Sequence, residues 1–246
     1  MINLMHHKKS PNIFIKPFSE ALTYFPELNN IYILIQETSF HGVQHTLRAY
    51  PPLVTLHWKI SNWVYAITIN KNKNINLSFY DVPFEEQVGF FLHELSHIAY
   101  YINFKKRDVF LFSIKYLFNK EFVRKLEKET DLRVIEKGGG VYLVLQRILL
   151  LNFRQNKPYK EVADTYITIN ELIENLKKYP NLYKKEEIEM CIDKYNEIKN
   201  TNTIHHPQSY ISITRKIKHT LKTVLAFIYA YPEMFYLITI KKTHLK

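Results

Sequence analysis

Two histidines and a glutamate occur in the order His93, Glu94 and His97, which is the pattern HExxH. On a helix, positions i and i+4 lie on one face, so both imidazoles can reach one metal ion. Zinc accepts neutral imidazole at about 2.0–2.1 Å, and a catalytic zinc site keeps one coordination position for water. Glu94 can face that water and take its proton as the water attacks a carbonyl. The pattern predicts one bound Zn²⁺ ion, with Glu94 as general base.

The residues around this pattern support the same interpretation. Glu94 is the only charged residue between Val88 and Tyr101, in a segment that is otherwise apolar. Burying a carboxylate is costly unless a cation or another partner compensates its charge. A metal ion would provide that compensation.

The third ligand decides the class of the predicted site. A metzincin would need Gly at 100 and His at 103, where the chain has Tyr100 and Asn103. Further along the chain, Glu127 and Asp131 stand one turn apart on a predicted helix. One can ligate the metal, while the other accepts a hydrogen bond from a ligand histidine. Glu129 is the alternative ligand, and for Glu127 the alternative is a solvated helix charge paired with a basic neighbour.

With these residues, the sequence over roughly 60–150 resembles the gluzincin clan of zinc metallopeptidases, whose small single-domain members include the minigluzincins. That clan combines HExxH on one helix with ExxxD on a later helix. The resemblance implies a zincin-like fold and a peptide or protein substrate. It also implies a full set of roles: metal ligands His93, His97 and Glu127, base Glu94, and Asp131 as the partner of His93.

Two further features are implied by the resemblance. Clan members have a histidine or tyrosine that stabilises the oxyanion of the tetrahedral intermediate, for which the candidates are His219, Tyr100 and Tyr142. They also have an edge strand beside the active-site helix that pairs with the substrate backbone. The candidate strand is 63–69, and an interior place in the sheet is its open alternative.

The N-terminal part predicts a small β-sheet. Residues 31–35 form a β-branched and aromatic run, and apolar residues alternate over 63–69, as in a half-buried strand. A polar turn then leads to 75–79, which predicts a hairpin, whereas 38–52 is expected to be irregular. A short helix over 18–25 is expected to end at Pro26.

The rest of the chain is predicted to be mainly helical, which makes the fold class α+β. Pro83 suits the first helical position, and the glycine run 138–140 suits a helix C-terminus because glycine adopts the left-handed conformation there. The expected helices are 83–101, 109–118, 121–136, 141–151, 169–178 and 186–199.

Composition limits the remaining function classes. The 246 residues are 46% hydrophobic and 23% charged, enough for a packed core, and the single cysteine, Cys191, excludes an intramolecular disulfide. Neither a signal peptide nor a membrane-spanning run is visible, so a cytoplasmic protein is expected. The net charge of +11 leaves a basic nucleic-acid-associated protein with a zinc site as an alternative. No element interleaves basic and aromatic residues, which makes nucleic acid the weaker partner.

Residues 1–199 are predicted to form the zincin-like metallopeptidase domain. Residues 200–246 are predicted to be a polar linker followed by a basic amphipathic helical segment, which could pack on the domain, bind a partner or dock on an anionic membrane surface. If that segment covers the cleft, the protein is a self-inhibited or inactive gluzincin-like interaction module. Truncation after Lys199 would then raise the activity.

Overall fold

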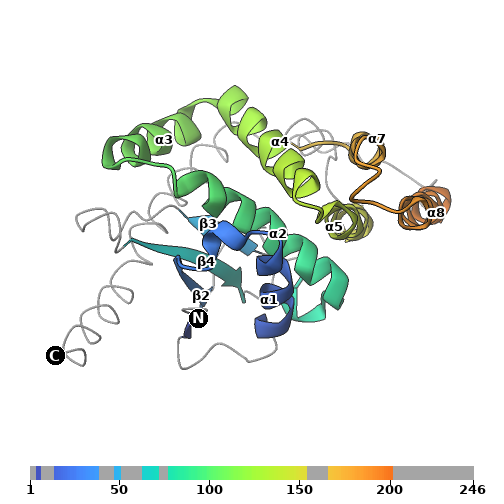
Figure 1. Ribbon diagram of the computed structural model, residues 1–246, viewed down its shortest axis with the longest axis horizontal. Coiled ribbons are helices and arrows are strands. Elements are labelled where there is room, and N and C mark those ends of the chain that lie inside the picture. The colour runs from blue at the N-terminus through green and yellow to red at the C-terminus, as the bar shows by residue number, and fades with distance from the viewer. Residues whose placement is uncertain are drawn as a thin grey trace, which may run out of the picture.

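The computed structural model describes residues 4–6, 14–38, 47–50, 63–71, 77–153 and 166–201, arranged as a small sheet with a larger helical part (Figure 1). The sheet has four strands in the order β1-β2-β4-β3. Strands β1 and β4 both run parallel to β2, and β3 runs antiparallel to β4 at the edge. The strands are β1 Leu4–His6, β2 Tyr32–Thr38, β3 Leu47–Tyr50 and β4 Val64–Asn70. The α+β prediction is confirmed.

Strand β4 lies in the interior of the sheet, between β2 and β3, with Ile67 paired to Ile35 on one side and Ala49 on the other. The alternation correctly predicts that Tyr65 and Ile67 join the main hydrophobic core. The half-buried prediction is wrong, because every residue of β4 is buried. Of the two positions left open for 63–69, the structure shows the interior one, and β3 lies at the edge of the described sheet.

The predicted hairpin is wrong as well. Both neighbours of β4 are other strands, and Phe79–Asp81 forms the short 3-10 helix η4. Strand β3 falls within the stretch 38–52 that was expected to be irregular, as does Thr38 at the end of β2. Its four residues carry little signal of their own, because a strand this short is defined by the neighbour with which it pairs.

The helices follow the predicted order. Helix α1 begins before residue 18, because Pro17 is tolerated in a first turn, where its missing N–H has no helical acceptor. A short 3-10 helix, η2 Pro26–Leu28, comes after α1. The α-helices are α1 Ile15–Thr23, α2 Phe84–Tyr101, α3 Lys106–Phe118, α4 Lys120–Glu136, α5 Gly140–Phe153, α7 Ile169–Lys177 and α8 Lys185–Thr201.

The helix ends agree with the sequence in part. Gly138 has φ of 90°, the left-handed conformation expected after α4. Pro83 is the N-cap of α2 and not its first helical residue. Asn200 and Thr201 belong to α8, so the predicted linker does not begin at 200. The remainder of that linker and the basic segment up to 246 lie outside the described residues.

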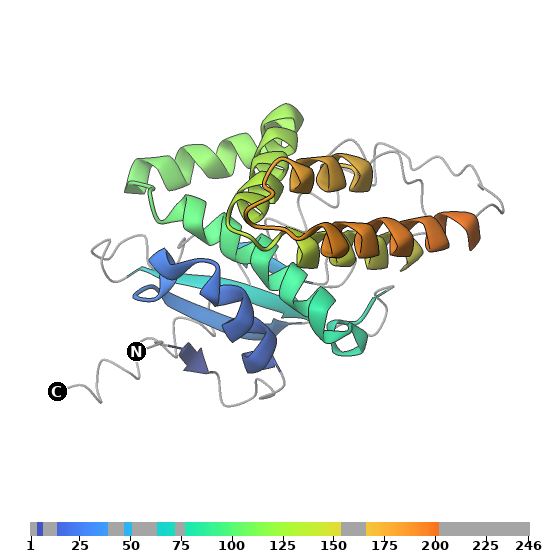
Figure 2. The same ribbon diagram turned by 45° about the vertical axis from the view of Figure 1, so that its right-hand side comes forward.

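Helix α2 is the centre of the molecule, running between the sheet and the layer that contains α4, α5, α7 and α8 (Figures 1 and 2). Its packing against α5 is close because Gly89 lacks a side chain: a Cβ there would lie 2.3 Å from the carbonyl oxygen of Tyr142. Helix α2 therefore holds its side chains between the sheet and this layer of helices.

Within the described part of the chain, no helix is both long and apolar enough to cross a membrane.

Candidate metal centre

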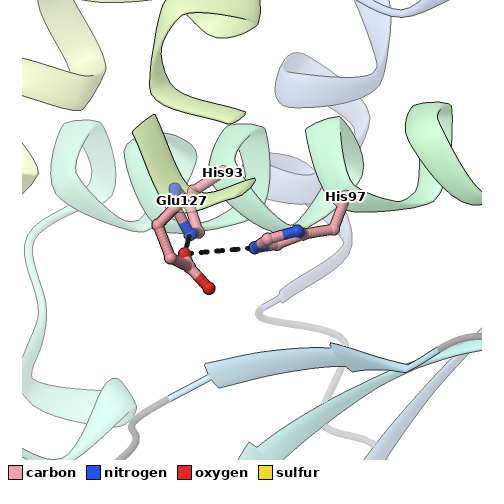
Figure 3. Close-up of side chains that lie close together, drawn as sticks. All are labelled: His93, His97 and Glu127. Atoms are coloured by element: carbon pink, nitrogen blue, oxygen red, sulfur yellow. Dashed lines mark hydrogen bonds and ion pairs between the residues drawn. The ribbon is translucent and has the colours of Figure 1, made fainter. Parts of the chain in front are cut away.

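His93 and His97 project from one face of α2 toward Glu127, which comes from α4 (Figure 3). The Oε2 atom of Glu127 lies 3.1 Å from Nε2 of His93 and 3.4 Å from Nε2 of His97. One ligand atom from each residue lies within 4.8 Å of those of the other two. Ligands held tetrahedrally at about 2.0–2.1 Å from zinc are about 3.3 Å apart. The donor set and its spacing therefore fit a zinc ion.

Helix α4 is joined to α2 beside this cluster. The hydroxyl of Ser96 donates to the carbonyl oxygen of Thr130 at 3.0 Å. The guanidinium of Arg133 donates to the Ser96 carbonyl oxygen at 3.1 Å and to its hydroxyl at 3.0 Å. These bonds fix the register of the two helices, so Glu127 faces the histidines one turn before Thr130.

A second set of contacts orients the two imidazoles. Nδ1 of His93 lies 2.9 Å from Oδ1 of Asp131. Nδ1 of His97 lies 3.3 Å from the hydroxyl oxygen of Thr130, whose own proton goes to the carbonyl oxygen of Leu126 at 2.8 Å. Both Nδ1 atoms thus donate outward, which leaves both Nε2 atoms directed at the space beside Glu127.

Arg147 of α5 holds Asp131 from the other side. Its Nη2 donates to Oδ1 of Asp131 at 2.7 Å, and the ring of Tyr166 lies 4.2 Å from the guanidinium carbon. The Tyr166 ring is also 5.9 Å from that of His93. Since the guanidinium remains charged, it keeps Asp131 ionised as the acceptor of the His93 proton.

Glu94 points toward the sheet. Its carboxylate accepts a hydrogen bond from the backbone N–H of Ala49 on β3. In the four-stranded sheet, β3 pairs only with β4, so this N–H belongs to the side of β3 that faces α2. Glu94 therefore lies between the helix that carries the histidines and the edge strand of the sheet.

The charges of the cluster call for a cation. Among the described residues, the only buried carboxylates are those of Glu94, Glu127 and Asp131, and the only buried guanidinium is that of Arg147. With neutral histidines, these groups leave an excess of two negative charges in a site that is at most 9% exposed at any of these residues. Such an excess is costly without compensation, and a divalent cation would remove it.

The pKa values show the same demand for positive charge. Burial by itself lowers the pKa of His93, but hydrogen bonds with Asp131 and Glu127 outweigh burial and raise this pKa to about 10. Burial raises the pKa of Glu127, yet the neighbouring His97 and the hydrogen bond with His93 hold it well below its usual range. Protons on the imidazoles and a metal ion thus compete for the same place.

Other sequence-based candidates lie elsewhere. Glu129 is 46% exposed and pairs with Lys125, so it is not in the cluster. Tyr100 packs against Phe104, which precedes α3, and against Phe112 of α3, whereas Tyr142 contacts Tyr24, the C-cap residue of α1. His219 lies outside the described residues, so its candidacy as an oxyanion donor is untested.

Several residues that shape the site were not predicted from the sequence. Ala49 could not be found, because only strand pairing brings its N–H to Glu94. Thr130 is an ordinary residue on the ExxxD helix and carries no signal alone. Arg147 did carry a signal in the sequence. It is the only charged residue of α5, just as Glu94 is the only charged residue within the apolar part of α2.

Comparison of the chain with protein-family models, with curated proteins and with solved structures finds no match in any of the three.

Proposed function

We propose that the protein is a zinc-dependent peptidase with a gluzincin-like site and a zincin-like fold. The observation that carries the proposal is the buried cluster of His93, His97 and Glu127, in a site whose buried side chains carry an excess of two negative charges when the histidines are neutral. Two imidazoles and one carboxylate are a ligand set found in hydrolytic zinc enzymes.

The chemistry divides between the metal and the chain. When bound, zinc supplies Lewis-acid activation of water and of a carbonyl group. Glu94 serves as the general base, because it is the one buried carboxylate of the site that is not bound to a histidine or to Arg147. Asp131 accepts the hydrogen bond from Nδ1 of His93, and Arg147 keeps Asp131 ionised. The ionised carboxylate makes Nε2 of His93 a stronger ligand for the metal.

The position of β3 supports an extended peptide as substrate. Within the described sheet, β3 is an edge strand, and its Ala49 N–H faces Glu94. A peptide added along this edge would pair with β3 and place a carbonyl carbon beside the proposed base. The edge-strand function that the resemblance implied for 63–69 is thus proposed for β3.

The decisive experiment combines zinc content with cleavage of a mixed peptide library. Purified full-length protein is expected to carry one zinc ion, measured by elemental analysis, and to cleave peptides. Glu127→Gln is expected to lose the zinc, and Glu129→Gln, on the same helix but exposed, is the matched control that should keep it. Retention of stoichiometric zinc by both Glu127→Gln and His93→Ala would refute the ligand assignment.

Activity is judged separately from metal binding. Glu94→Gln should keep its zinc and lose cleavage. A wild-type protein that binds one zinc ion but cleaves no peptide would support the alternative, a gluzincin-like interaction module.

A further inference from the structure

The outer face of α3 exposes large apolar side chains. Phe110, Leu111, Ile114 and Phe118 are 63%, 51%, 41% and 80% exposed, respectively. Phe110, Ile114 and Phe118 follow one another at i, i+4 and i+8, and Leu111 is one turn before Ile114 and two turns before Phe118, so all four share one helix face. A contiguous apolar surface of this kind on a protein marks an interaction site.

Among the described residues, this face is not the side of α3 that packs on the rest of the protein. The core side consists of Val109 and Phe112, which are buried and point away from the outer stripe by helical spacing. In both views α3 lies at the periphery of the molecule, beyond the C-terminal end of α2 (Figures 1 and 2). The other large apolar residues that are exposed in the described part of the chain lie apart from one another: Tyr80 in η4, Leu182 between α7 and α8, and Met190 in α8.

Basic residues border the stripe. Lys106 and Lys115 are exposed and lie on opposite sides of it by helical spacing, and Arg107 is near its N-terminal end. From 105 to 125 the chain has seven lysines and arginines but only two acidic residues, Asp108 and Glu121. The Asp108 carboxylate is engaged locally, since it accepts a hydrogen bond from the backbone N–H of Lys105 at 2.8 Å.

We infer that α3 docks on an anionic lipid surface, lying in the plane of the interface. Phe110, Ile114 and Phe118 would enter the boundary between headgroups and acyl chains. The long side chains of Lys106 and Lys115 would extend to the lipid phosphates. A lipid surface of negative charge complements both parts of this face, and this docking does not depend on the metal centre.

The basic border favours a lipid surface over two other candidates for covering this face, a second copy of the chain and the C-terminal segment. A second copy of the chain, packed by two-fold symmetry, would bring the same basic border against itself. The C-terminal segment of this chain is also basic, with Arg215, Lys216 and Lys218 close together. Neither would complement the lysines beside the stripe.

The test is co-sedimentation of the full-length protein with vesicles. One set contains phosphatidylglycerol and phosphatidylcholine in equal parts, and the other contains phosphatidylcholine alone. The protein should partition onto the anionic vesicles, and binding should weaken between about 0.1 M and about 0.5 M salt, since salt screens the lysines. Equal binding to both vesicle types, or none to the anionic ones, would overturn the inference.

Variants locate the surface. Phe110→Ser with Phe118→Ser should weaken partitioning by about tenfold or more, because two aromatic side chains no longer enter the interface. Leu182→Ser with Met190→Ser is the matched control, which removes exposed apolar groups elsewhere and should bind like the wild type. Circular dichroism verifies the fold of both. Undiminished binding by the α3 variant would assign lipid binding to another segment and overturn the inference.

Sedimentation velocity on the same protein samples tests the alternative that the α3 face binds a second copy of the chain. A monomeric wild type is expected in the absence of vesicles. A dimer that the α3 substitutions dissociate would show that this face binds a second copy, contrary to the inference.

Discussion

Helices α2 and α3 follow one another in the chain and depart from ordinary burial in opposite directions. Helix α2 is buried from Gln87 through Ala99 and takes His93, Glu94 and His97 into the interior. Helix α3 buries only Val109 and Phe112 and leaves four large apolar side chains in solvent, those of Phe110, Leu111, Ile114 and Phe118. Charged groups are normally outside, and large apolar groups are normally inside.

Each departure points to something that the polypeptide itself does not supply. On our proposals, a divalent cation would compensate the buried charges of α2 and α4, and an anionic lipid surface would cover the apolar face of α3. The difference shows that comparing the burial of each side chain with its polarity indicates two kinds of candidate site. Buried charged groups indicate a metal site, and exposed large apolar groups indicate a docking surface.

The largest effect is expected for the base on α2. Glu94→Gln should lower kcat for peptide cleavage by about 10²–10⁴-fold, because the amide cannot accept the proton that general-base catalysis moves. Zinc content should be unchanged, since Glu94 is outside the ligand cluster. Steady-state kinetics on a fluorogenic peptide from the library measures the loss, with Glu129→Gln as the control. Unchanged kcat in Glu94→Gln would remove this residue from the chemistry.

The next largest effect is expected on thermal stability when the metal is removed. A ligand present at about a thousandfold over its Kd contributes about 4 kcal/mol, and each kcal/mol shifts Tm by about 2–4 °C at this chain length. A chelator should therefore lower Tm by roughly 10 °C, measured by calorimetry, and Glu127→Gln should have lost this response. A Tm indifferent to the chelator would show that the buried charges are compensated within the chain.

Truncations of apolar side chains in the two helices should differ sharply. Leu95→Ala in α2 should cost about 2–5 kcal/mol, because it opens a cavity in the core. Phe118→Ala in α3 should change the free energy of unfolding by no more than about 0.5 kcal/mol, because the ring is exposed. Urea unfolding measures both. A comparable loss in Phe118→Ala would mean that the chain itself covers this face.

A smaller effect is expected where α2 crosses α5. Gly89→Ala should cost about 1–3 kcal/mol, since its Cβ would be 2.3 Å from the Tyr142 carbonyl oxygen and the helices would have to move apart. Glu85→Ala, exposed in the first turn of α2, is the control for helix propensity. Urea unfolding again gives the difference, and a neutral Gly89→Ala would contradict the close crossing.

Much of the site was predictable because its information is local. The i and i+4 spacing of His93 and His97 fixes their common face on any helix, whatever packs around it. Glu127 and Asp131 share a face for the same reason. The apolar surroundings of Glu94 indicated burial of a charge, and the lone Arg147 in α5 carried the same signal.

The choice between Glu127 and Glu129 required the tertiary structure, because the rotation of α4 about its axis is set by the bonds of Ser96 and Arg133 between the helices. Strand positions required it too. An alternating pattern identifies which residues of β4 enter the core but not which strands lie beside it, since pairing joins segments distant in sequence. Thus the sequence by itself determined the two histidines and the helix that carries them, and it limited the candidates for the third ligand to one later helix. Only the folded chain decided that Ala49 of an edge strand meets Glu94 and that the outer face of α3 stays uncovered by the described residues, because both depend on which segments become neighbours in space.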